Sequence, residues 1–212
     1  RREASIIDTL PSKLEKALHW SPTINKEQKE VIRYILWNMV YVEGGTANLG
    51  DNNNYPVDVA SFFINRYEVS QDEWYVIMGE NPSNQHRRNY PVDQVNWFNA
   101  QRFTKKLSQL SGLPFRLPFE AEWEYAARGG LKTKNFIYAG SNNAEQVAWF
   151  REKYYNTYVS KETGTKKPNE LGLYDMSGNV YEWCMDWYDR KVPFTGNIAP
   201  VISEKDTHKV LR

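Results

Sequence analysis

The stretch FRLPFEAEWEYAARGG, residues 115–130, gives the clearest fold signal in the chain. Acidic residues fill the first turn of a helix expected from Glu120 to Arg128, and a Gly-Gly pair marks its C-terminal end. The residue before this helix is Phe119, whose side chain cannot accept the hydrogen bond of an N-cap. Losing such a cap costs about 1 kcal/mol, so we expect packing of Phe119 to offset the loss.

Charged residues around this helix favour a structural role. Glu120, Glu122 and Glu124 lie in its first turns, where carboxylates interact favourably with the positive end of the helix dipole. Acid–base chemistry is the alternative, but carboxylates in the first turns of a helix are more often partners of the helix dipole. We expect Arg116 to pair with one of these acids or with a backbone carbonyl. The segment therefore predicts a scaffold helix.

Capping signals and apolar spacing predict three more helices, at residues 26–38, 71–78 and 97–111. The second follows a capping box made by Ser70 and Glu73. From residue 39 onward, short apolar runs bounded by glycines, asparagines and a proline indicate strands and turns. Few short strands and helices and much irregular chain predict an α+β domain.

Composition narrows the classes of partner. The 212 residues are 41% hydrophobic, which fits one domain with a substantial core. The formal charge of +1 argues against nucleic acid as a partner. No apolar run approaches the ~20 residues that cross a bilayer, so we expect no membrane insertion. The first residues lack the apolar core of a signal peptide, which leaves the compartment, including export, undetermined.

Four segments in order resemble the formylglycine-generating-enzyme family of sulfatase-modifying factors. They are NRYEVSQDEWYVIMGENPS (65–83), YPVDQVNWFNAQRF (90–103), FRLPFEAEWEYAARGG (115–130) and PNELGLYDMSGNVYEWCMDWY (168–188). The resemblance spans residues 39–189 and implies a C-type-lectin-like fold with bound calcium. The helix expected at residues 26–38 lies outside the resemblance, so we expect an N-terminal helical extension over residues 1–38 and a family domain over residues 39–212 that lacks its C-terminal segment.

One part of the fourth segment suits a hard cation. Asp175 and Glu182 bracket a Ser-Gly-Asn sequence that turns easily and can aim carbonyls inward. Calcium takes six to eight oxygen ligands from carboxylates, carbonyls and water. The resemblance implies a structural calcium site made by the side chains of Asp175 and Glu182 and the carbonyls of Gly178 and Val180. In the alternative, Asp175 only caps backbone N–H groups of a turn.

A second calcium site of the family is not expected here. The resemblance aligns Val147 with an asparagine ligand of that site, and valine offers only its carbonyl. Asn142 and Asn143 lie nearby but out of register.

Catalysis in the family needs a pair of cysteines that bind copper(I), a soft ion that thiolates suit. Those cysteines follow a Gly-Gly-Ser motif, and Arg212 matches the arginine that precedes the motif. Cys184 lies among large apolar residues, which predicts a small buried side chain and no reactive thiol. His19, His86 and His208 are dispersed and show no ligand spacing.

Function classes follow from the site, because one fold hosts several functions. We favour a non-catalytic, calcium-stabilised binding or scaffold module for a protein or glycan ligand. The alternative is a copper-dependent formylglycine-generating oxidase that acts on a substrate cysteine and is completed by a C-terminal cysteine pair. A structural partner stabilised by calcium is a third possibility.

Overall fold

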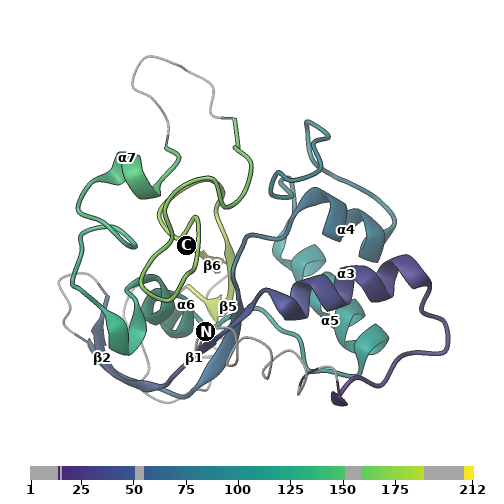
Figure 1. Cartoon of the computed structure of the whole chain (residues 1–212), viewed down its shortest axis with the longest axis horizontal. Helices are drawn as coiled ribbons and strands as arrows, with labels where there is room; N and C mark the ends of the chain where they lie inside the picture. The colour runs from purple at the N-terminus through teal and green to yellow at the C-terminus, as the bar shows by residue number, and fades with distance from the viewer. Residues whose placement is uncertain (1–13, 15, 51–54, 151–158, 189–207) are drawn as a thin grey trace, which may run out of the picture.

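The computed structural model describes residues 14, 16–50, 55–150, 159–188 and 208–212. Its elements lie in two halves, with three helices packed together in one and the strand pairs and α6 in the other (Figure 1). Helices, short antiparallel strand pairs and long irregular segments together confirm the predicted α+β class.

The helical half contains α3 (Lys26–Trp37), α4 (Gln71–Met78) and α5 (Trp97–Ser111), as the sequence predicts. Full capping boxes begin α3 and α4, and an asparagine side chain caps α5. The apolar faces of the three helices meet in one buried cluster, where the rings of Trp74 and Phe103 stack with centroids 5.0 Å apart.

The strands of the other half form three antiparallel pairs. In the first pair, β1 (Met39–Val42) lies against β4 (Phe62–Asn65), with Val40 opposite Ile64. The remaining pairs join β2 (Gly45–Leu49) with β3 (Tyr55–Val59), and β5 (Trp183–Trp187) with β6 (Lys209–Leu211).

Helix α6 (Glu120–Ala127) contacts β2, β3 and β5 and fills the centre of this half. Tyr125 and Ala126 of α6 are buried against a core of residues from the strands and the later loops, namely Val42, Leu49, Val57, Val59, Leu173 and Met176. This central, buried position of α6 confirms the predicted scaffold helix. Two short helices follow α6: the 3-10 helix η2 (Gly130–Lys132) and α7 (Ala144–Val147).

The start of α6 shows how the missing cap is replaced. Phe119 makes no side-chain cap, and its ring lies 4.7 Å from the Arg116 guanidinium, which confirms the expected packing. The free Glu120 N–H instead donates to the Asp186 carboxylate at 2.7 Å. Strand β5 therefore supplies the N-cap of α6 from a distant part of the chain.

The carboxylates of α6 have specific partners. Arg116 binds Glu122 through two hydrogen bonds of 2.7 Å, as the sequence predicts for that arginine. Glu124 accepts from Arg128 and from Arg212, and Arg212 also pairs with Glu120 at 2.7 Å. These ion pairs confirm the structural role and add to the dipole interaction that the sequence alone suggests.

Within the described part of the chain, no helix combines the length and the apolar character needed to cross a membrane.

Candidate functional site

The loop from Asp175 to Glu182 forms a turn between the irregular segment that precedes it and β5. Asp175 is 3% exposed and has a left-handed backbone, with φ of 57°. Its Oδ2 accepts the Gly164 N–H at 2.7 Å, whereas its Oδ1 is buried and has no hydrogen-bond partner among the described residues. One oxygen thus caps a backbone N–H, as the alternative expects, while the other is a buried polar atom without a partner in the described part of the chain.

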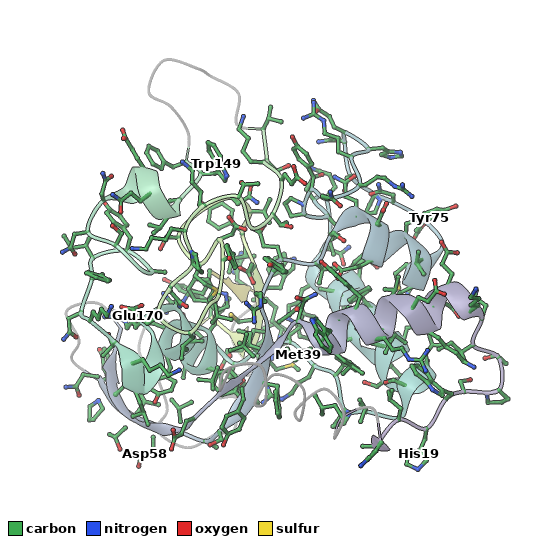
Figure 2. The ribbon with its side chains drawn as sticks, in the orientation of Figure 1. His19, Met39, Asp58, Tyr75, Trp149 and Glu170 are labelled. Carbon is green, nitrogen blue, oxygen red and sulfur yellow. The ribbon has the colours of Figure 1, made fainter. Side chains whose placement is uncertain are left out.

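The turn requires a glycine because its backbone lies against Trp149. Figure 2 shows that Trp149 lies in one half of the molecule and Tyr75, on α4, in the other. Gly178 has φ of 145°, and a Cβ there would lie well under 3.0 Å from the Trp149 carbonyl oxygen. That carbonyl accepts the Asn179 N–H at 2.8 Å. In a trans peptide the C=O opposes the N–H, so the Gly178 carbonyl points away from Trp149.

Glu182 ends the turn and directly precedes β5. Its backbone exchanges hydrogen bonds of 2.7 and 2.9 Å with Arg212. The residue keeps part of its surface exposed, yet its carboxylate lies deep enough that burial raises its pKa to about 7. The nearby Trp123 indole opposes this rise in pKa, and Asp175 adds to it.

Glu68 also belongs to this site, although the sequence did not indicate it. It is 6% exposed, and its carboxylate accepts the Asn179 side-chain amide at 2.6 Å and the Val180 N–H at 3.1 Å. Burial, followed by the charges of Glu182 and Asp175, raises its pKa well above the usual 4.5. The only sequence signal is an acid within the short apolar stretch YEVS, far from the turn.

Three carboxylates thus influence one another in the protein interior. In the described part of the chain, Glu68, Asp175 and Glu182 form no ion pair with lysine or arginine. Buried carboxylates are stable only when they are protonated, paired or bound to a cation. The unpartnered oxygen of Asp175 and the carboxylate of Glu182, with carbonyls between them, are the hard donors that calcium prefers.

Side chains alone do not complete a metal site. No three His, Cys, Asp or Glu side chains are grouped so as to hold a metal ion among the described residues. The calcium ligands implied by the resemblance are two carboxylates and two main-chain carbonyls, so that site requires the backbone of the turn and water for the remaining positions.

In the region of the second family site, Val147 and two nearby asparagines have structural contacts. Val147 is 1% exposed and ends α7. Asn143 caps α7 by accepting the Glu145 N–H at 3.0 Å, and Asn142 accepts the Ile137 N–H at 2.9 Å. Both asparagines therefore organise local turns.

Cys184 is fully buried in β5, as predicted, and burial raises the pKa of its thiol. A buried thiol with a raised pKa is a poor nucleophile and a poor metal ligand.

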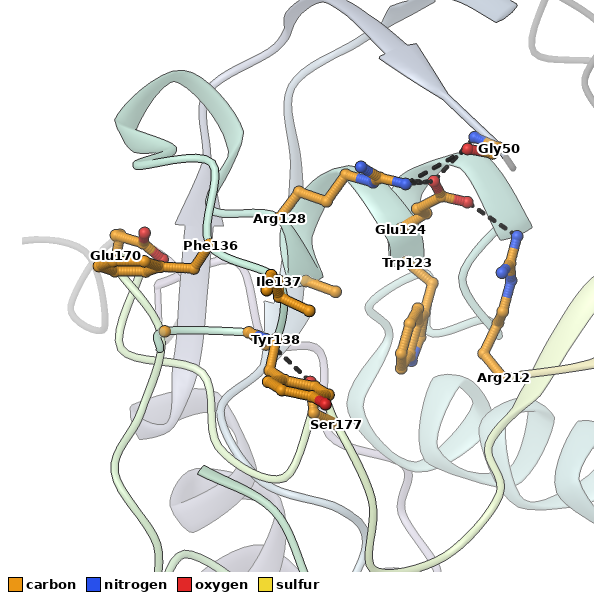
Figure 3. A pocket seen from close by; sticks show the side chains of 13 residues that line it. Gly50, Trp123, Glu124, Arg128, Phe136, Ile137, Tyr138, Glu170, Ser177 and Arg212 are labelled. Atoms are coloured by element: carbon orange, nitrogen blue, oxygen red, sulfur yellow. Dashed lines mark hydrogen bonds and ion pairs between the residues drawn. The ribbon is translucent and has the colours of Figure 1, made fainter. Parts of the chain in front are cut away.

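A pocket of about 220 Å³ lies beside the turn (Figure 3). Arg128 and Arg212 reach Glu124 from two sides at 2.7 and 2.8 Å. Ser177 belongs both to the turn and to the lining of the pocket. Its hydroxyl accepts the N–H of Ala139, another lining residue, at 2.9 Å. The remaining lining residues are Gly50, Trp123, Ala127, Phe136, Ile137, Tyr138, Gly140 and Glu170.

Comparison with known proteins identifies the family. The model of the sulfatase-modifying factor enzyme 1-like domain matches residues 26–212. The chain therefore belongs to the sulfatase-modifying factor, or formylglycine-generating enzyme, family, as its motifs indicate. The match includes α3, upstream of the residues that carried the resemblance.

Two relatives illustrate the range of the family. A protein named chaperone protein LppX from Paenibacillus barcinonensis is 35% identical over 204 residues, covering 71% of this chain and 72% of the relative. The formylglycine-generating enzyme of Streptomyces coelicolor is 35% identical over 112 residues, covering 48% of this chain. The match spans only 34% of that enzyme's length.

A solved structure confirms the fold. Treponema denticola variable protein 1 superposes with a TM-score of 0.60 and 30% identity, and the match covers 71% of this chain and 73% of that protein. The predicted α+β, C-type-lectin-like fold of the family is therefore the fold of this chain.

Proposed function

We propose that this domain is a non-catalytic binding module for a protein or glycan ligand and that calcium stabilises its turn at residues 175–182. The observation that carries the calcium part is the buried Oδ1 of Asp175, which has no hydrogen-bond partner among the described residues and whose carboxyl lies within electrostatic reach of Glu182. A bound calcium ion would neutralise charge that the described residues leave uncompensated and would fix the turn.

The pocket supports the binding part of the proposal. Its rim carries Phe136, Ile137 and Tyr138, which are 36%, 76% and 40% exposed. The same lining also contains arginines and carboxylates, which can donate and accept hydrogen bonds. Aromatic side chains beside polar groups suit sugar rings and protein side chains. A volume of about 220 Å³ is enough for one such group.

Residues of the chain itself also support a non-catalytic role. The only cysteine in the sequence is Cys184, and it is enclosed in the core. Two relatives with broad coverage carry names that describe a chaperone protein and a variable protein. Neither name describes an oxidase.

A direct test compares ligand capture by wild type and by two single variants. Tyr138→Ala removes a rim ring, whereas Tyr75→Ala removes a 56% exposed ring from α4, in the other half of the molecule. We expect a protein or glycan retained from a lysate or a glycan array to be lost with Tyr138→Ala and kept with Tyr75→Ala. Absence of any retained ligand, together with oxidase turnover by the protein, would overturn the proposal.

The copper-dependent oxidase remains a second candidate, favoured by similarity to the Streptomyces coelicolor enzyme. Arg212 is fixed by Glu120 and Glu124, which would set the starting direction of a following Gly-Gly-Ser segment. The test uses the complete reading frame with copper(I), oxygen and a cysteine-containing peptide. Mass spectrometry of the peptide would show formylglycine if this candidate is correct, and an unchanged peptide would reject it.

A further inference from the structure

The segment that follows β4 contacts the turn on both sides of its first carboxylate. The Arg66 carbonyl accepts the Tyr174 N–H at 3.0 Å, directly before Asp175. Two residues later, Glu68 accepts the Val180 N–H at 3.1 Å. The same short piece of chain therefore holds the turn at its beginning and near its end.

Two successive peptide units of the turn are fixed from outside it. Trp149 holds the unit between residues 178 and 179 by accepting the Asn179 N–H, and Glu68 holds the next unit by accepting the Val180 N–H. Glu68 also accepts a hydrogen bond of 2.6 Å from the side-chain amide of Asn179. The backbone of Asn179 is left-handed, with φ of 62°. A left-handed asparagine between two fixed units leaves the turn little freedom to open.

Both oxygens of Glu68 are already engaged by the turn, one with each partner. The carboxylate of Glu68 is therefore suited to holding the calcium ligands in place and not to binding the ion itself. Its charge nevertheless acts on the same site, because Glu68 lies within electrostatic reach of both Asp175 and Glu182.

We propose that Glu68 is the positioning residue of the calcium site: by holding Asn179 and the Val180 amide, it keeps the turn in the conformation that presents its oxygens to the ion. This inference rests on the proposed calcium site. Without the Glu68 contacts, calcium would have to order the turn itself, and that ordering would weaken binding.

The test measures calcium affinity by isothermal titration calorimetry on the full chain, with Glu68→Gln against Glu73→Gln. The control is well matched because Glu73 is also buried, at 7% exposure, and also binds a backbone N–H and a side chain, but it caps α4 away from the turn. Glutamine keeps the size of Glu68 but replaces one acceptor oxygen with an NH2 group. That NH2 group would face a hydrogen-bond donor, either the Asn179 side-chain amide or the Val180 N–H.

We expect the calcium Kd of Glu68→Gln to rise at least tenfold while that of Glu73→Gln stays within twofold of wild type. Equal affinities in wild type and Glu68→Gln would overturn the inference and leave the calcium site standing. A wild type that binds no calcium would overturn both. If Glu68→Gln does not fold, Asn179→Gly removes the 2.6 Å contact while tolerating the left-handed backbone, and it too must weaken calcium binding.

Discussion

Raising the pH in the absence of calcium should destabilise this protein through Glu182. Burial raises the pKa of Glu182 in the folded state to about 7 from an ordinary 4.5. A carboxyl whose folded pKa is raised contributes its full stabilisation below the unfolded value and loses it as pH rises through the folded value. The window is therefore pH 4.5 to about 7.

The magnitude follows from the size of the shift. Each pKa unit corresponds to about 1.4 kcal/mol, so between pH 5 and 8 the loss is roughly 2 to 3 kcal/mol. This figure is an upper value, because part of Glu182 is exposed. Burial also raises the pKa values of Glu68 and Asp175, so these carboxyls act in the same direction. Calcium should reverse the trend, because it binds the ionised carboxylates.

The assay is urea unfolding followed by tryptophan fluorescence at pH 5, 6, 7 and 8 in metal-free buffer. Glutamine does not titrate, so the stability of Glu182→Gln relative to wild type should increase by roughly 2 to 3 kcal/mol over this range. Glu80→Gln, at an exposed position, serves as control. A difference between Glu182→Gln and wild type that does not change with pH would refute the reasoning.

Three further outcomes test the structure. Gly178→Ala should lower the free energy of unfolding by at least about 2 kcal/mol in urea titrations, because its Cβ would overlap the Trp149 carbonyl; unchanged stability would contradict this contact. Asp186→Ala should cost about 1 kcal/mol in calorimetry by removing the N-cap of α6, and a neutral effect would argue against that cap. Chelating calcium should lower the Tm of wild type but not of a variant that lacks the side chains of Asp175 and Glu182; an equal Tm of wild type with and without chelator would remove both from the metal ligands.

Local sequence signals predicted the helices well. The pairs Asn25 with Gln28 and Ser70 with Glu73 formed the expected capping boxes, because each motif satisfies its backbone groups within a single turn. The buried state of Cys184 likewise followed from its apolar neighbours. Such features depend on residues a few positions apart, which a sequence displays directly.

Contacts between segments far apart in the chain could not be predicted from the sequence. The Asp186 cap of α6 and the Glu68 contacts with the turn join residues 66 and more than 100 positions apart. A lone acid gives no sign of which backbone amide it will meet. The motif at residues 175–182 indicated two carboxylates of the site, whereas the third became apparent only once the fold brought the segment that follows β4 into contact with the turn.

The dependence of α6 on later parts of the chain has a consequence for the order of folding. Its first N–H is capped from 66 positions downstream, and its Glu124 pairs with Arg212, 88 positions downstream. Contacts so distant in sequence form slowly, because the intervening chain must first be ordered. During synthesis the central helix should therefore stay loosely docked until β5 and β6 have emerged from the ribosome. Proteases should cleave nascent chains near residue 120 more readily than the finished domain.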